Sequence, residues 1–249
     1  MLGVVAAIQT LKWIFKREDI SEKNFDKLIK YGVIGIFAGA RLGHCLFYDW
    51  EYYSDHLLEM ILPVSFPEEG GFKFTGYAGL ASHGGALGLL IALILYARKT
   101  NTPLLNTLDF IAIITGVSAA FIRLANFMNS EIIGKPTNSD WGVVFERTDT
   151  LSRHPAQLYE SIIYFLIFGL MLFLYKTKKE KLNNGGFFGL VLILIFSARF
   201  FIEFVKENQV GFEDGMALNM GQILSIPYVL AGLGFLVYGM KRSKEEIAS

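Results

Sequence analysis

Residues 119–134 read AAFIRLANFMNSEIIG, and this stretch decides how the rest of the chain is interpreted. It begins in a long apolar segment and carries four polar or charged residues where that segment ends: Arg123, Asn126, Asn129 and Glu131. An arginine at the centre of a membrane helix costs about 2.5–3.5 kcal/mol on insertion scales, so it is seldom found there without a role. We therefore expect Arg123 to belong to a functional site.

The composition is that of an integral membrane protein. Hydrophobic residues make up 53% of the 249 residues and charged residues only 18%, well below the roughly 25% of an average soluble domain. The mean hydropathy is +0.41. The 23 basic and 23 acidic residues cancel, so the net charge does not indicate a nucleic-acid partner. A single cysteine, Cys45, excludes a disulfide within the chain and a cysteine cluster for a metal.

Apolar segments alternate with short charged connections along the whole chain. Segments of about 20 residues match the thickness of a bilayer core crossed by a helix. The first segment is short, and we expect a transmembrane helix that lacks its outer end. The sequence thus predicts an all-α, polytopic bundle of about seven transmembrane helices that forms one domain, residues 1–249, with spans near 1–15, 31–48, 77–96, 104–123, 157–175, 186–204 and 220–240.

The distribution of basic residues predicts the orientation of this bundle. Fifteen of the 23 lysines and arginines lie in the connections 10–30, 97–103, 176–182 and 241–249, whereas five lie in the connections 49–76, 124–156 and 205–219. Cytoplasmic connections carry the excess of positive charge. We therefore expect the N-terminus outside, the C-terminus inside, and the three longer, acidic loops on the extracytoplasmic side.

The ionisable residues within the predicted spans gather near one membrane surface. Five spans place such residues near their outer ends: Arg41, His83, Arg123, Glu160, and Arg199 with Glu203. An ion pathway would require ionisable groups across the whole thickness, and the main candidate at the inner side, Asp109, is isolated. The layered pattern favours an outward-facing site for a lipid headgroup.

Two interpretations are open for the charged pair on the sixth span. Arg199 and Glu203 have i,i+4 spacing, so they can form an ion pair that neutralises both charges within the membrane. Alternatively, the planar guanidinium of Arg199 binds a phosphate while Glu203 holds it in place. Asn126 shares a helix face with Arg123, but an asparagine there can simply form an interhelical hydrogen bond.

Other polar residues also have a structural alternative. Gly84 and Gly88 form a small-xxx-small face that allows close helix packing, beside which His83 can be either a hydrogen-bonded structural residue or a general base. The stretch RHPAQLYE, 153–160, is typical of a helix start. Glu160 then enters the membrane as an unpaired acid unless it meets an arginine.

Five blocks of the chain together resemble a known family. RLANFMNSEIIG, 123–134, closely resembles the signature of bacterial prolipoprotein diacylglyceryl transferases, in which arginine, asparagine, phenylalanine, asparagine, glutamate and glycine recur at these spacings. The other blocks are similar to those of the family and follow in its order: GARLGHCLFY at 39–48, SHGG at 82–85, HPAQLYE at 154–160 and ARFFIEF at 198–204.

The resemblance implies a reaction and a set of site residues. Diacylglyceryl would pass from phosphatidylglycerol to the lipobox cysteine thiol of a preprolipoprotein at the bacterial inner membrane, releasing glycerol phosphate and needing no metal or other cofactor. The implied catalytic residues are His83, Glu160, Arg199 and Glu203, and those implied to bind phosphatidylglycerol are Arg41, Arg123, Asn126, Asn129, Glu131 and Gly134. Such chemistry requires a base for the thiol and cations for the leaving phosphate.

The chain departs from the family pattern at three places. Ile122 replaces a glycine that often precedes the signature arginine, and Lys206 stands where many members have arginine. Lysine keeps the charge but not the bidentate geometry. A tyrosine-containing block of the family's first helix has no counterpart in this N-terminal segment.

Two other classes of function compete with the transferase. A transporter or channel with an outward-facing anion site would be favoured by ionisable residues at the midplane and inner leaflet. A metal-dependent phosphatidyl transferase would require clustered aspartates for a hard cation, and the predicted spans contain no such cluster.

Overall fold

The structure is a computed structural model that describes residues 1–66, 70–77, 79–208 and 215–248. Its internal contacts divide the chain into two compact units. The first unit comprises Met1–Ile14 and Leu105–Ser249, and the second comprises Phe15–Leu104.

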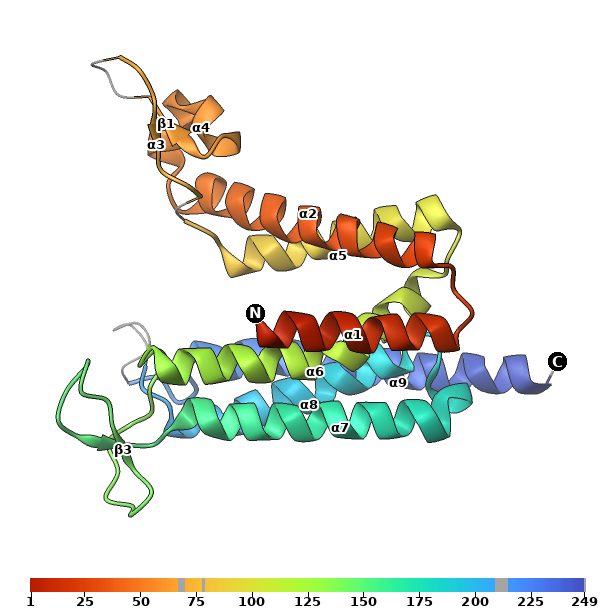
Figure 1. Ribbon diagram of the computed structural model, residues 1–249. Helices are drawn as coiled ribbons and strands as arrows, with labels where there is room; N and C mark the ends of the chain where they lie inside the picture. The colour runs from red at the N-terminus through yellow and green to blue at the C-terminus, as the bar shows by residue number, and fades with distance from the viewer. Residues whose placement is uncertain (67–69, 78, 209–214, 249) are drawn as a thin grey trace. The chain divides into compact units, whose positions relative to one another are not determined.

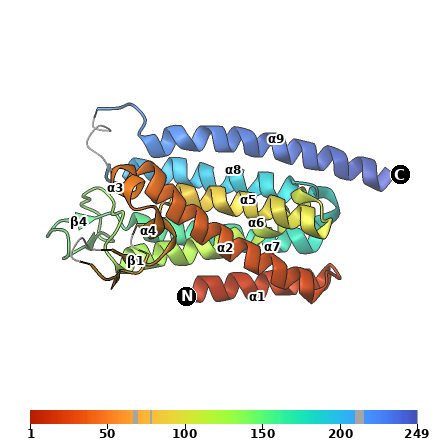
Figure 2. The same cartoon turned by 90° about the horizontal axis from the view of Figure 1, so that it is seen from above.

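The first unit is built from long helices (Figure 1). Its helices and strands are α1 (Leu2–Arg17, which continues into the second unit), α6 (Leu104–Met128), β3 (Val143–Val144), β4 (Ser152–Arg153), α7 (Ala156–Leu182), α8 (Gly186–Ile202), the 3₁₀-helix η1 (Glu203–Val205) and α9 (Met220–Ala248). β3 and β4 pair antiparallel in the long connection between α6 and α7. Figure 2 shows α8 and α9 side by side along most of their length.

Glycines set the close approach of helices in this unit. A Cβ atom at Gly232 of α9 would lie 2.8 Å from the carbonyl oxygen of Gly189 on α8, and one at Gly116 of α6 would lie 2.9 Å from the carbonyl oxygen of Tyr164 on α7. A side chain at either glycine would force the backbones apart. The small residues therefore bring α6, α7, α8 and α9 into the register that positions their polar side chains.

Asp109 has a structural place in this unit. Its two carboxylate oxygens accept hydrogen bonds from the backbone N–H groups of Gly185 and Phe188, each at 2.8 Å. These are N–H groups at the start of α8, which have no partner within the helix. Asp109 thus caps α8 from the neighbouring α6, so its burial is explained without an ion pathway.

The second unit contains α2 (Glu22–Phe47), α3 (Trp50–Asp55), α4 (Leu57–Ile61), β1 (Val64–Ser65), β2 (Lys73–Phe74) and α5 (Ser82–Thr100). The predicted small-residue packing face is confirmed: a Cβ atom at Gly39 of α2 would lie 2.7 Å from the Cα of Gly88, and one at Gly43 would lie 2.7 Å from the Cα of Gly84. α2 and α5 consequently pack backbone against backbone.

Within the described residues, four helices are long and apolar enough to cross a membrane: Leu104–Met128, Ala156–Leu182, Gly186–Val205 and Met220–Glu245. The mainly helical, integral membrane architecture expected from the sequence is therefore supported. Two short antiparallel strand pairs, β1 with β2 and β3 with β4, were not expected. The count of seven spans, the orientation and the single domain stay predictions.

Candidate active site

The stretch 119–134 forms the end of α6 and a loop that folds back on it. The carboxylate of Glu131 accepts hydrogen bonds from the side-chain amides of Asn126, at 2.6 Å, and Asn129, at 3.3 Å. Ser130 and Ile132 on either side of it have φ of +58° and +55°. A β-branched residue rarely adopts such a conformation. The polar residues of the stretch thus hold a strained loop in one shape, as is typical of functional sites.

Arg123 joins this loop to α7. Its Nη1 donates to Asn126 Oδ1 at 3.3 Å, and its Nε lies 2.9 Å from Oε2 of Glu160. The latter contact is an ion pair without the alignment of a hydrogen bond. Glu160 is fully buried. The expectation that this acid requires an arginine partner is confirmed.

Lys206 connects Glu160 to Glu203. Its ammonium donates to Glu160 Oε1 at 3.1 Å and to Glu203 Oε2 at 3.3 Å, and it is buried like both acids. The hydroxyl of Tyr164 also donates to Glu160 Oε1, at 3.3 Å. Arg123, Glu160, Lys206 and Glu203 therefore form a series of alternating charges, which we call the charge cluster; Arg123 is partly buried and the other three residues are buried. Its two cations and two anions balance.

Arg199 does not form the i,i+4 ion pair that was one of the two interpretations for this residue. Arg199 lies in the last turn of α8, and within the described residues its guanidinium forms no ion pair with Glu203, while its Nε is buried without a hydrogen-bond partner. The helical turn between the two residues is present, because the backbone N–H of Glu203 still donates to the carbonyl oxygen of Arg199. The carboxylate of Glu203 points to a different cation: the buried ammonium of Lys206 lies between Glu203 and Glu160 and donates to both.

A cavity of about 350 Å³ lies between α6, α7 and α8. Its lining is mostly apolar, and its polar groups come from Thr115, Arg123, Tyr164 and Arg199. Since Arg123 is already paired with Glu160, Arg199 supplies surplus positive charge to the lining. An apolar cavity with one unpaired guanidinium is chemically suited to an anionic group that carries hydrocarbon.

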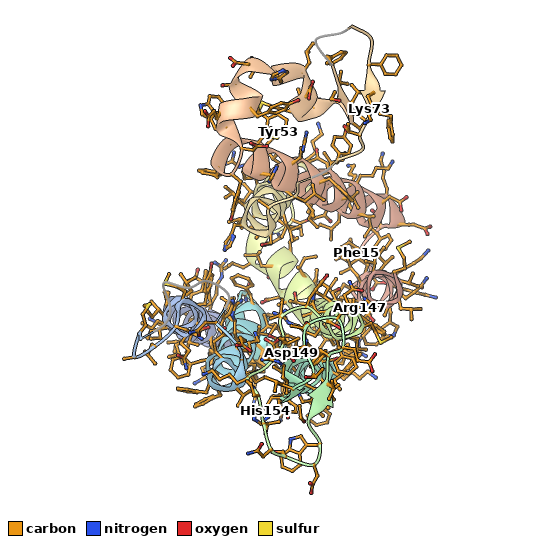
Figure 3. The ribbon with its side chains drawn as sticks, turned by 90° about the vertical axis from the view of Figure 1, so that its left-hand side faces the viewer. Phe15, Tyr53, Lys73, Arg147, Asp149 and His154 are labelled. Carbon is orange, nitrogen blue, oxygen red and sulfur yellow. The ribbon has the colours of Figure 1, made fainter. Side chains whose placement is uncertain are left out.

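Arg153 binds the end of the loop after α6 without belonging to the charge cluster. Its guanidinium donates to the carbonyl oxygen of Gly134 at 3.1 Å and pairs with Glu207 and Asp149. Figure 3 labels Asp149, and the hydrogen bond from Arg153 lowers the pKa of this carboxyl. The backbone N–H of Gly134 donates to the carbonyl oxygen of His154 at 3.1 Å. Gly134 is thereby fixed beside the segment that carries Lys206.

Two expected site residues lie in the second unit. Arg41 is buried, and its guanidinium donates to the carbonyl oxygens of Glu59, at 2.6 Å, and Met60, at 3.1 Å. It also donates to the hydroxyl of Tyr53, labelled in Figure 3, at 3.1 Å. Arg41 thus fastens α3 and α4 to α2. His83 is exposed in the first turn of α5. The roles expected for both residues in the reaction stay predictions.

Sequence reasoning did not assign the structural roles of Lys206 and Arg153. In the sequence, Lys206 is a departure from the family pattern, and Arg153 is the first residue of the helix-start stretch 153–160. A signal was available for Lys206, because its i,i+3 spacing from Glu203 allows an ion pair. Arg153 has no comparable signal in its sequence surroundings.

Apolar helices around a largely buried charge cluster and a cavity define a helical integral membrane protein with an internal polar site. The family model described as "Prolipoprotein diacylglyceryl transferase" matches residues 1–238, and the chain belongs to this family of transferases.

Relatives named phosphatidylglycerol–prolipoprotein diacylglyceryl transferase are similar to this protein over nearly the whole chain. The protein from Bacteroides fragilis is 57% identical over 243 residues, which cover 97% of this chain and 88% of the relative. The protein from Tolumonas auensis is 45% identical, with 96% and 88% covered. The protein from Chloroherpeton thalassium is 39% identical, with 100% and 88% covered.

Proposed function

We propose that this protein transfers the diacylglyceryl group of phosphatidylglycerol to the lipobox cysteine thiol in the signal peptide of a preprolipoprotein, with release of glycerol phosphate. Family membership and the names of the relatives support the reaction class. One observation assigns the reaction to a site. The guanidinium of Arg199 lines an apolar cavity and has no ion-pair partner among the described residues. The charge cluster beside it is already balanced.

The bond changes explain the need for this surplus charge. The thiol sulfur attacks the glycerol carbon that carries the phosphodiester, a sulfur–carbon bond forms, and the carbon–oxygen bond to phosphate breaks. The electron pair of that bond leaves with glycerol phosphate, so the phosphate gains one negative charge, and a base takes the thiol proton. Fixed cations in an apolar cavity stabilise charge that develops in the transition state. Arg199 supplies this stabilisation, with Arg123 as the second cation.

The remaining residues of the charge cluster hold Arg123 in place. Glu160 and Glu203 are each paired with Lys206, so these three residues fix the position of the Arg123 guanidinium. Because Lys206 already has two carboxylate partners at 3.1 and 3.3 Å, we assign it to this support and not to the phosphate.

The headgroup and the thiol require further groups. Asn126, Asn129 and Glu131 form a polar, hydrogen-bonded loop after Arg123, which suits recognition of the glycerol hydroxyls. Gly134 keeps the end of this loop close to neighbouring backbone. From the second unit, Arg41 contributes to lipid binding and His83 takes the thiol proton.

The proposal places the protein in the bacterial inner membrane as one multi-pass domain. Seven spans run from an outer N-terminus to an inner C-terminus, the loops 49–76, 124–156 and 205–219 are extracytoplasmic, and the site opens toward the outer leaflet. The distribution of basic residues supports this orientation.

The test is to supply membranes that contain the protein with labelled phosphatidylglycerol and a lipobox peptide. A peptide that carries the label through a thioether is the expected product. The competing transporter would move anions or lipid across the bilayer of sealed vesicles without forming a covalent product. Movement without a lipidated thiol would overturn the proposal.

A further inference from the structure

The start of α9 lies directly against the carboxylate of Glu203. A Cβ atom at Gly221 would lie 2.6 Å from Cδ, 2.7 Å from Oε1 and 2.9 Å from Oε2 of Glu203. These distances are shorter than van der Waals contact, so only a glycine leaves the carboxylate where it is. Glu203 is buried and has Lys206 as its ion-pair partner.

Hydrogen bonds fix the backbone that carries Gly221. The N–H of Gln222 donates to Asn219 Oδ1 at 3.0 Å and the N–H of Asn219 donates to Gln222 Oε1 at 3.1 Å, which is a reciprocal capping arrangement. Gln222 Nε2 also donates to the carbonyl oxygen of Phe200 in α8, at 3.3 Å. The hydroxyl of Ser225 donates to the carbonyl oxygen of Gly221 at 2.6 Å. The first turn of α9 is therefore attached both to itself and to α8.

We propose that Gly221 is a positioning residue for the transfer reaction, because it sets the place of the Glu203 carboxylate. Glu203 pairs with Lys206, Lys206 pairs with Glu160, and Glu160 pairs with Arg123. The start of α9 thus determines where the far end of this series, the Arg123 guanidinium, lies in the cavity. This inference rests on the proposed function.

Substituting Gly221 would disturb the charge cluster more than the fold. The atoms that a new Cβ would meet are the far end of a flexible side chain, so Glu203 can rotate away without unfolding the helices. Rotation would weaken its contact with Lys206 and leave that buried ammonium with Glu160 alone. Reactions are sensitive to displacements of this kind, since a shift of about 1 Å can reduce a rate roughly 100-fold.

The experiment compares Gly221→Ala with Gly234→Ala in the full-length protein. Gly234 lies in the same helix, and a Cβ atom there would meet no described atom within 4 Å, so Gly234→Ala is the matched control. We expect Gly221→Ala to lower the transfer rate roughly 10- to 100-fold and Gly234→Ala to leave it unchanged. We also expect Gly221→Ala to lower the melting temperature relative to the control, because Lys206 loses part of its pairing.

The double variant Gly221→Ala with Glu203→Asp separates positioning from general packing. Aspartate is shorter by one methylene, so it leaves room for the new Cβ. We expect Gly221→Ala to cost almost nothing, in rate and in melting temperature, when Glu203→Asp is already present. The melting temperature provides this comparison even where Glu203→Asp abolishes transfer.

Each outcome decides the inference. Wild-type activity in Gly221→Ala, or equal losses in melting temperature with and without Glu203→Asp, would overturn the positioning role while the proposed function stands. Failure of Gly221→Ala to accumulate would support the role only if the double variant accumulates, and would overturn it otherwise. A wild-type protein without transfer activity would overturn both the proposed function and this role.

Discussion

Arg123 Nε on α6 and Glu160 Oε2 on α7 lie 2.9 Å apart, and this ion pair ties one of the two cavity-lining arginines to the fold. The other, Arg199, has no ion-pair partner among the described residues. The two arginines that line the same cavity therefore differ in their ion pairing. Substituting each one should show which of them affects only the transfer rate and which also affects the free energy of unfolding.

Arg199→Ala should reduce transfer roughly 100- to 1,000-fold, the usual effect of removing one group that stabilises developing charge. The melting temperature should stay the same or rise, because no ion pair is lost and an unpaired cation leaves an apolar environment.

Arg123→Ala should reduce transfer similarly but also lower the free energy of unfolding by about 1–3 kcal/mol, since Glu160 keeps Lys206 but loses one partner.

Transfer assays and thermal unfolding in detergent check both expectations. Arg147→Ala, in an exposed part of the loop between α6 and α7, is the control and should change neither quantity. Near-normal transfer by Arg199→Ala would show that this arginine is structural.

Asp109→Ala should destabilise the protein without harming its chemistry. The substitution leaves the buried N–H groups of Gly185 and Phe188 without their acceptors, which should cost about 1–3 kcal/mol of unfolding free energy. Asp109→Asn keeps one acceptor and should cost less. The folded fraction of both variants should transfer diacylglyceryl at the wild-type rate. Lost transfer at unchanged stability would instead indicate a functional role for Asp109.

Glu59 should make the second unit less stable in acid. Burial raises the pKa of its carboxyl, but hydrogen bonds from the Phe66 N–H and the Tyr52 hydroxyl, with the charges of His56 and Arg41, outweigh burial and lower the pKa overall. A lowered pKa means that the folded state favours the charged form. The Glu59 carboxylate therefore stabilises the fold fully above the ordinary pKa of glutamate. This stabilisation is lost as the pH falls through the lower pKa that Glu59 has in the folded state.

The measurement compares the melting temperatures of wild type and Glu59→Gln between about pH 7 and pH 3, a range that includes the ordinary glutamate pKa. Wild type should be the more stable at the upper end, and the difference should shrink toward the lower end. Glu51→Gln, an exposed residue of α3, is the control. A difference that grows in acid would contradict this account.

The positions of the long helices were largely predictable from the sequence, because apolar runs and small-residue spacing are local features. The small-residue face between α2 and α5 shows this. The start of α2 was missed: the apolar run begins near residue 31, whereas the helix begins at Glu22, after a cap by Ser21. Hydropathy marks only the apolar part of such a helix.

Contacts in the charge cluster were predictable only where an unpaired buried charge would cost too much free energy. A buried Glu160 requires a cation, so its pairing with an arginine followed from the energetic cost of burying an unpaired charge. The sequence did not identify Arg123 as that arginine. Glu160 as a partner of Lys206, and the N–H groups that bind Asp109, come from other helices and leave no trace in local spacing. The ion pair of Arg199 with Glu203, one of two interpretations of their i,i+4 spacing, does not form, because the carboxylate of Glu203 pairs with Lys206.

His83→Gln tests the assignment of the general base. If His83 takes the thiol proton, the ratio of wild-type to variant transfer rates should fall as the pH rises, since a thiol that is already deprotonated needs no base. The rates should be compared between about pH 6 and pH 9, which brackets the titration of free histidine and cysteine side chains. A ratio that is flat across this range would contradict the base role and favour a hydrogen-bonding or packing role.

Cysteine labelling tests the orientation. The native Cys45 is first replaced by serine, and single cysteines are then introduced at Asp140, in the loop between α6 and α7, and at Lys178, near the end of α7; both positions are exposed. Intact cells treated with an impermeant thiol reagent should label the cysteine at position 140 and not the one at 178. The reverse result would contradict an outward-facing site.

The proposed transfer releases one glycerol phosphate for each thioether that is formed. Purified wild-type protein should be incubated with phosphatidylglycerol and a lipobox peptide, and both products quantified by mass spectrometry, with a peptide that carries serine in place of the cysteine as control. The account predicts equal amounts of glycerol phosphate and lipidated peptide, and neither product from the serine peptide. Release of glycerol phosphate without a lipidated cysteine, or no product at all, would contradict it.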